Sequence, residues 1–175
     1  KSQEKVSASA ILITNATIID VRTGSIIKNR QVVIDSGKIQ KISETVTNAD
    51  QYTTTIDGKG KFLMPGLAEM HAHIPQRASK ELVDETLFLY LSNGITTIRG
   101  MLGHPSHLGL REKAKKNEIL SPRIYTSSPS LNGNSIRTKE EAIQKVTQYQ
   151  KDGYDFLKIH PGIQLDVFDA AVKTA

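Results

Sequence analysis

The feature that most limits the fold of this chain is an alternation of apolar segments of strand length with amphipathic segments of helix length. The strand-like segments lie near residues 63–74, 95–100, 122–126 and 154–159, and helix-like segments follow near 79–93, 106–117, 138–153 and 164–175. Apolar spacing is what distinguishes the two kinds of segment. Four strand–helix units in succession predict parallel strands joined by right-handed crossovers, and therefore an α/β fold.

A closed barrel of such units needs eight strands and typically about 250 residues. The 175 residues of this chain have room for four units. We therefore expect residues 63–175 to form the first half of a TIM-type (β/α)8 barrel, and the chain to be an N-terminal fragment that is inactive on its own. Because half a barrel has open edges with unpaired backbone groups, the expected partner there is the remainder of the same chain or another copy.

Residues 11–62 contain short β-rich runs separated by turn signals such as Ser36-Gly37, which predicts a small antiparallel sheet. Residues 1–10 are polar and small, and a flexible N-terminus is expected. The chain begins with Lys1 rather than Met. A tag remnant and a mature exported protein both remain open, so the expected location is cytoplasmic, or periplasmic or secreted if a signal peptide was removed.

The composition narrows the possible partners and metal ligands. Because there are no cysteines, any metal must be held by His, carboxylate or modified Lys side chains. The net charge of +5 is scattered and aromatic residues make up 5%, which argues against nucleic-acid binding. No apolar run approaches the roughly 20 residues that span a bilayer. A small molecule is the expected binding partner.

Two histidines, His71 and His73, end the first strand-like segment with one residue between them. Residues two apart in a strand point to the same face, with Cα atoms roughly 6.5–7 Å apart. Two imidazoles at this separation can converge on one ion at about 2.0–2.1 Å. A metal site and a pair of polar residues where a strand meets a loop are both compatible with the spacing alone.

The residues around this pair resemble a known family. Asp57-Gly-Lys-Gly-Lys61, Met64-Pro-Gly-Leu67 and Glu69-Met-His-Ala-His73 occur in the order found at the barrel entry of the amidohydrolase superfamily. The most similar subgroup contains imidazolonepropionase-like proteins and metal-dependent dipeptidases. The resemblance implies that His71 and His73 bind one metal of a one- or two-metal site, with zinc the expected ion. It also implies that residues 11–62 are one portion of a small β-sandwich domain.

The same resemblance bears on Lys158. The segment Gly153-Tyr-Asp-Phe-Leu-Lys-Ile159 is similar to a stretch in which the family carboxylates the lysine with CO2 and uses the carbamate to bridge two metals. An unmodified ammonium has no lone pair and cannot bind a cation. The alternative is an ordinary lysine at the barrel rim. The family pattern adds two more histidines and an aspartate general base, which are expected beyond Ala175.

Four further residues are candidates for lesser roles. Arg99 and His160 end the second and fourth strand-like segments, and either could bind substrate. A structural ion pair is the alternative for Arg99, and a second-shell or loop position for His160. His104 and His107 flank Pro105 and are expected to be solvated loop histidines.

These observations predict a metal-dependent hydrolase of C–N bonds in amides, cyclic amides or dipeptides, acting through metal-activated water. The alternative is a non-catalytic scaffold or assembly module with the same fold, because a fold alone does not establish a function.

Overall fold

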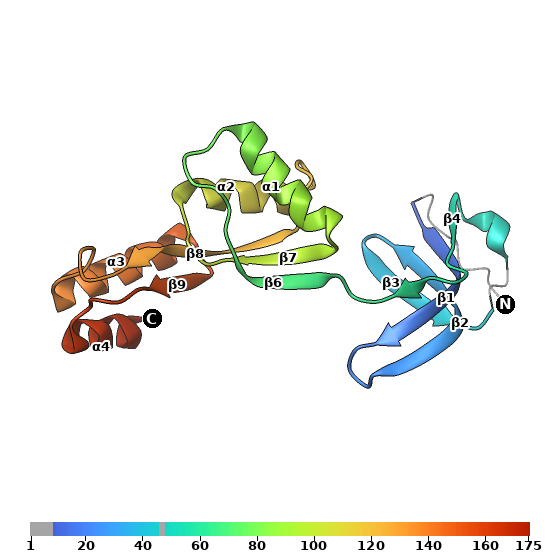
Figure 1. Ribbon diagram of the computed structural model, residues 1–175, viewed down its shortest axis with the longest axis horizontal. Coiled ribbons are helices and arrows are strands. Elements are labelled where there is room, and N and C mark those ends of the chain that lie inside the picture. The colour runs from blue at the N-terminus through green and yellow to red at the C-terminus, as the bar shows by residue number, and fades with distance from the viewer. Residues whose placement is uncertain (1–8, 46–47) are drawn as a thin grey trace. The chain divides into compact units, whose positions relative to one another are not determined.

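The computed structural model describes residues 9–45 and 48–175 (Figure 1). The chain divides into two compact units, Lys1–Pro65 and Gly66–Ala175. Each unit is described by itself. No helix in the described part of the chain is long and apolar enough to cross a membrane.

The first unit is a five-stranded sheet. Its strands are β1 (Ile11–Asp20), β2 (Ser25–Asp35), β3 (Lys38–Ser43), β4 (Thr54–Asp57) and β5 (Phe62–Leu63), with a 3-10 turn at Ala49–Gln51. The order is β3-β2-β1-β4, and β5 also pairs with β1. The first three strands are antiparallel, but β4 and β5 run parallel to β1. The prediction of an antiparallel sheet is therefore wrong for β4 and β5, because the chain crosses from β3 to the opposite edge of β1 before it pairs again.

Local backbone geometry explains the strand boundaries of this sheet. Ser36 and Gly37 both have positive φ, 50° and 71°, which is the pair of conformations that a tight hairpin turn requires. Strand β3 is largely exposed, with Ile39 61% and Ile42 51% exposed. The described residues of this unit form one layer, and the second layer of a sandwich is not among them.

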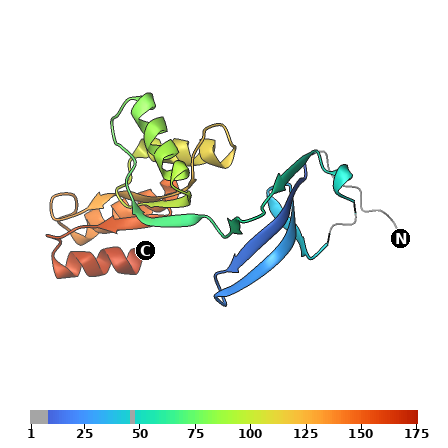
Figure 2. The same cartoon turned by 45° about the vertical axis from the view of Figure 1, so that its right-hand side comes forward.

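The second unit alternates strands and helices, as predicted. Its elements are β6 (Leu67–Ala72), α1 (Lys80–Ser92), β7 (Ile95–Gly100), α2 (Pro105–Lys115), β8 (Arg123–Leu131), α3 (Lys139–Asp152), β9 (Phe156–Ile159) and α4 (Leu165–Thr174). The four strands are parallel in the order β6-β7-β8-β9. They form a curled half-barrel sheet, and the helices pack against it (Figure 2). Strand β8 continues to Leu131, five residues beyond the predicted strand.

Capping side chains set the ends of the helices. Thr138 and Glu141 form a reciprocal capping box at α3, with Thr138 Oγ1 accepting from the Glu141 N–H at 3.2 Å. The Glu141 carboxylate accepts from the N–H groups of Arg137 and Thr138, and these bonds hold its pKa below the ordinary value. Gly153 ends α3 at φ 88°, a conformation that costs glycine little. The predicted ends of α3 are therefore confirmed.

Two apolar clusters attach the helices to the sheet. Ala72, Ile74, Leu87, Ile98 and Ile124 form one under α1 and α2. The other lies under α3 and α4 and contains Leu131, Ile136, Ala142, Val146, Val167 and Ala171. Two apolar helix residues lie outside these clusters. Ile143 is 46% and Leu165 75% exposed, because the apolar arcs of both helices are wider than their buried faces.

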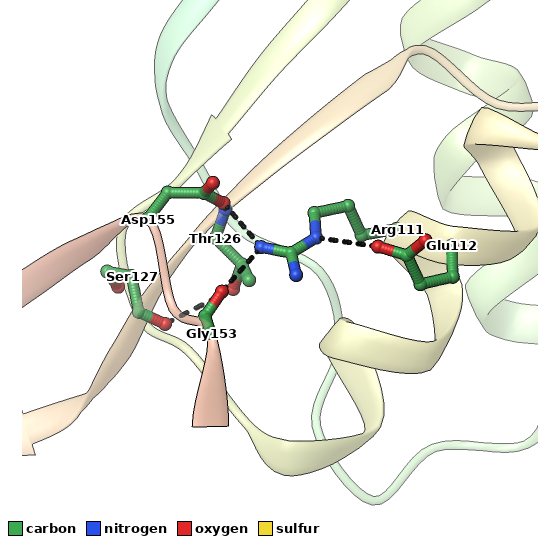
Figure 3. A network of polar contacts seen from close by, with 6 residues as sticks. All are labelled: Arg111, Glu112, Thr126, Ser127, Gly153 and Asp155. Atoms are coloured by element: carbon green, nitrogen blue, oxygen red, sulfur yellow. Dashed lines mark hydrogen bonds and ion pairs between the residues drawn. The ribbon is translucent and has the colours of Figure 1, made fainter. Parts of the chain in front are cut away.

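A polar network at the start of β9 joins three elements (Figure 3). One carboxylate oxygen of Asp155 accepts from the Thr126 N–H of β8 at 2.8 Å and from Arg111 of α2 at 3.0 Å. The same Arg111 nitrogen donates to the Gly153 carbonyl at 2.8 Å. The side chains of Arg111 and Asp155 are only 21% and 26% exposed. Asp155 therefore fixes where β9 begins relative to β8 and α2.

Replacing Asp155 tests this role. Asp155→Ala removes an acceptor from two donors, and we expect it to lower the free energy of unfolding by about 2 kcal/mol, since hydrogen bonds to charged groups contribute about 1.5–3 kcal/mol each. Asp155→Asn keeps an oxygen for Thr126 and should cost less. Urea denaturation measures both, with Asp169→Ala on the exposed side of α4 as the control. Equal effects of Asp155→Ala and Asp169→Ala would contradict the assignment.

Candidate active site

The alternation of side chains in the parallel sheet defines its two faces. Ala72, Ile98 and Ile124 pack against residues of α1 and α2. Neighbouring residues along a strand point to opposite faces. His71, Arg99 and Tyr125 therefore lie on the face turned away from the helices, with His71 and Arg99 near the carboxyl ends of β6 and β7. This is the end at which barrels of this kind place their functional side chains.

His71 and His73 lie side by side at the end of β6. Their ring centroids are 5.4 Å apart with an interplanar angle of 27°, and both side chains are exposed. The backbone N–H of His71 donates to Glu69 Oε1 at 2.8 Å. The Tyr90 hydroxyl of α1 lies 3.3 Å from the backbone nitrogen of His73 and 3.2 Å from the His73 carbonyl oxygen. These backbone contacts hold the strand end and leave the imidazoles free to accept a ligand.

No cluster of three or more His, Cys, Asp or Glu residues occurs within residues 9–45 and 48–175. The imidazole pair is therefore two donors of a site that needs more. Imidazole nitrogen is a preferred donor for zinc and other first-row divalent ions. The pair thus fits a divalent metal in its chemistry, and its ligand set would be completed by other groups.

Lys158 lies on β9, the edge strand at the opposite side of the sheet from β6, with β7 and β8 between them. Its side chain is half-buried, and its N–H donates to Ser128 Oγ at 3.2 Å. In the β8–β9 register, Ser127 faces Phe156 and Ser130 faces Lys158, so β8 has one extra residue there. This bulge was not predicted from the sequence. Pro129, which lacks an N–H, was the available signal.

Arg99 bridges strands of the same sheet. Its Nε donates to the Met70 carbonyl of β6 at 2.8 Å, and its guanidinium carbon lies 5.7 Å from the centroid of the Phe156 ring of β9. A cation at this distance from an aromatic ring is attracted by it. Arg99 forms no ion pair with any described residue. The positive charge therefore stays on the face that carries His71.

His160 follows β9 and is held by β8. Its N–H donates to the Leu131 carbonyl at 2.8 Å, and its Nδ1 lies 2.8 Å from Ser130 Oγ. It borders an open pocket of about 460 Å³, lined also by Ile159, Pro161, Gly162, Ile163, Leu165 and Phe168. Ser130 was not predicted as a functional residue, since a serine beside a proline reads as a turn.

The prediction of a solvated loop histidine is wrong for His107, while His104 lies just before α2 and is half-buried. His104 is the N-cap of α2, and its Nδ1 accepts from the Ser106 N–H. His107 lies inside α2 and is 1% exposed, and neither of its ring nitrogens has a hydrogen-bond partner among the described residues. Burial, with a smaller contribution from His104, lowers the pKa of His107, and the backbone of Pro75 opposes this weakly.

The second unit is a curled parallel half-barrel sheet with His71, Arg99 and Lys158 near the carboxyl ends of its strands. The sequence profile of the Amidohydrolase family matches residues 62–166, more than half of the chain. The chain therefore belongs to the amidohydrolase family, whose members generally bind divalent metals.

Individual relatives give the extent of the similarity. A dihydroorotase from Carboxydothermus hydrogenoformans is 37% identical over 90 residues, 50% of this chain and 20% of the relative. A 5′-deoxyadenosine deaminase from Methanosarcina acetivorans is 42% identical over 78 residues, 43% of this chain and 17% of the relative. The crystal structure of an Xaa-Pro dipeptidase with methionine in its active site superposes with a TM-score of 0.79 at 20% identity, over 95% of this chain and 54% of that chain.

The chain thus spans a fifth or less of these two relatives and about half of the solved structure. At 20% identity, the dipeptidase shows the fold alone.

The buried His107 predicts a pH dependence of stability. Its folded pKa is lowered, whereas in the unfolded chain it titrates near 6.5. Between these two values the unfolded state binds more protons, so stability should fall as pH drops below about 6.5. His107→Leu should remove this part of the pH dependence. Urea unfolding of both proteins from pH 5.5 to pH 8 measures it, and a pH-independent difference between them would contradict the prediction.

Proposed function

We propose that this chain is the N-terminal part of a metal-dependent hydrolase that cleaves C–N bonds in amide, cyclic amide or dipeptide substrates. The observation that carries the proposal is the pair of exposed imidazoles at the end of β6, inside the region that matches the Amidohydrolase family. Relatives named dihydroorotase, deaminase and dipeptidase support a C–N bond as the target. The subgroup with imidazolonepropionase-like proteins and dipeptidases remains the preferred assignment.

His71 and His73 would hold the metal, with zinc the preferred ion. When bound, a divalent ion lowers the pKa of a water ligand to around 7 and polarises a carbonyl group. The backbone contacts of His71 with Glu69 and of His73 with Tyr90 keep the strand end fixed. Fixed ligands place a metal more accurately than ligands on a mobile loop would.

Lys158 would supply the bridging ligand after carboxylation. The neutral amine nitrogen attacks the carbon of CO2, forms an N–C bond and releases one proton, which leaves an anionic carbamate. Lys158 is half-buried and follows Phe156 and Leu157 in β9. Its backbone is held by Ser128 Oγ, so the end of the long side chain would be the only part that moves.

Arg99 and His160 would contact the substrate. The guanidinium of Arg99 is held by Met70 and Phe156 without a carboxylate, so it can attract a substrate oxygen that carries negative charge. His160 lies beyond Lys158 at the same strand end and borders the open pocket.

Removing one imidazole tests the metal site. The test uses a protein that carries this chain together with the strands that complete the barrel. His71→Ala and His73→Ala should each reduce bound zinc by half or more, because each variant removes one of the two imidazole donors to the same ion. Elemental analysis after zinc loading measures this. His107→Leu removes an imidazole elsewhere and serves as the control. Wild-type zinc content in both site variants, or no metal and no turnover in the wild type, would favour the non-catalytic scaffold.

Replacing Lys158 tests the carbamate. Lys158→Ala should lose turnover and one equivalent of metal, and added acetate or propionate should restore part of both by supplying a carboxylate in the vacated space. Lys158→Arg should not respond, because the guanidinium keeps its charge and occupies that space. Metal content and turnover are measured with and without the added acid. Full activity of Lys158→Ala would remove this residue from the mechanism.

A further inference from the structure

The turn after β8 fixes the orientation of the Asn132 amide. Asn132 Oδ1 lies 2.9 Å from the Asn134 nitrogen and 3.1 Å from the Ser135 nitrogen. Both are backbone N–H donors, so the atom that receives them must be the oxygen of the amide. The NH2 group therefore points the other way, where Asn132 Nδ2 lies 3.4 Å from Ser130 Oγ.

This orientation determines what Ser130 does. Because Asn132 donates to Ser130 Oγ, the serine hydroxyl keeps its own hydrogen for another acceptor. His160 Nδ1 lies 2.8 Å away, and among the described residues the Ser130 hydroxyl has no other acceptor. Donation from the hydroxyl to Nδ1 uses this hydrogen, whereas an Nδ1–H donor would leave it without an acceptor among the described residues. A neutral imidazole that accepts at Nδ1 carries its proton at Nε2.

The β-bulge in β8 brings these groups together. The extra residue of β8 sets Ser130 opposite Lys158, and His160 follows Lys158 by two residues, on the same side of the extended chain. The two loops beyond the strands also pack closely, since Gly133 lies against the Gly162 carbonyl with no room for a Cβ atom. The imidazole of His160 is thus held beside Lys158 and remains exposed.

We propose that Asn132, Ser130 and His160 form a relay that presents the Nε2–H of His160 as a fixed hydrogen-bond donor to an oxygen of the substrate. The inference rests on the proposed function and extends it to the substrate class, which must carry a carboxylate or carbonyl oxygen close to the scissile C–N bond. Asn132 and Ser130 are positioning residues. His160 is the residue that touches the substrate.

The tautomer of His160 is the first test and requires no activity. In protein with 15N-labelled histidine, the ring nitrogen shifts of His160 should report a proton at Nε2, with the signal assigned from a His160→Gln variant. Asn132→Asp keeps the oxygen that accepts hydrogen bonds from the backbone N–H groups of Asn134 and Ser135, but it replaces the NH2 donor to Ser130 with an acceptor oxygen. Ser130 then donates to Asp and accepts from Nδ1–H, so the proton should move to Nδ1.

Asn134→Asp is the matched control, because it makes the same chemical change two residues away, in a side chain outside the relay, and should leave the tautomer unchanged. An Nδ1–H tautomer in the wild type, or an unchanged tautomer in Asn132→Asp, would overturn the relay.

Steady-state kinetics is the second test, in the protein with a completed barrel. Ser130→Ala and Asn132→Asp should raise KM by about tenfold, the effect of one hydrogen bond of about 1.4 kcal/mol, with a smaller change in kcat. Ser130→Thr keeps the hydroxyl and should retain KM near the wild-type value. A dipeptide and its C-terminal amide distinguish the two acceptors. An effect confined to the dipeptide identifies a carboxylate, and an equal effect on both identifies the scissile carbonyl.

The outcomes separate this inference from the proposed function. Lower thermal stability of Ser130→Ala with unchanged KM would show a purely structural bond and would overturn the inference, while an active wild type would leave the proposed function intact. Absence of both metal and turnover in the wild type would overturn the proposed function, and the tautomer measurement would still decide the relay.

Discussion

The alternation of side chains across one parallel sheet is the constraint on which the second unit depends. Ala72, Ile98 and Ile124 are buried beneath α1 and α2, and each occupies a strand position next to a residue of the opposite face. Burial of the first set therefore forces His71, Arg99 and Tyr125 onto the other face. A shift of one residue in any of these strands would place a polar or aromatic side chain where Ala72, Ile98 or Ile124 is now buried. The apolar core therefore also favours the register in which the polar groups lie on the other face.

Polar contacts hold β9 in addition to the apolar core. At the start of β9, the Asp155 carboxylate accepts hydrogen bonds from the Thr126 N–H and from Arg111. Near the end of β9, Ser128 Oγ accepts a hydrogen bond from the Lys158 N–H. Strand β9 has only four residues, so backbone pairing alone fixes it weakly. Side-chain acceptors at both ends hold its position against β8, and the direction in which Lys158 and His160 point follows from that position.

Much of this arrangement could be predicted from local sequence patterns. Helix α3 is an example, because the Thr138 and Glu141 capping box and Gly153 mark both of its ends. Local patterns do not state which strands pair, and the parallel pairing of β4 with β1 was therefore missed. The same limit applies to candidate sites: the spacing of His71 and His73 predicted that their rings would lie together, but the burial of His107 depends on tertiary packing.

Strand β8 shows why the remaining polar groups escaped prediction. Ser127, Ser128 and Pro129 read as a turn, yet Ser127 and Ser128 are fully buried within a strand. Their hydroxyls donate to the carbonyls of the following residues, which meets the requirement that buried polar groups be hydrogen-bonded. Pro129 cannot donate to the ladder, and the strand bulges there.

That bulge leaves two serine hydroxyls, one on each side of the proline, as the contacts to β9. Ser128 receives the backbone of Lys158, and Ser130 contacts the ring of His160. A regular β8 of apolar residues would supply neither contact. The serines and the proline are therefore explained by the positions they give to Lys158 and His160, more than by the stability they add to the sheet.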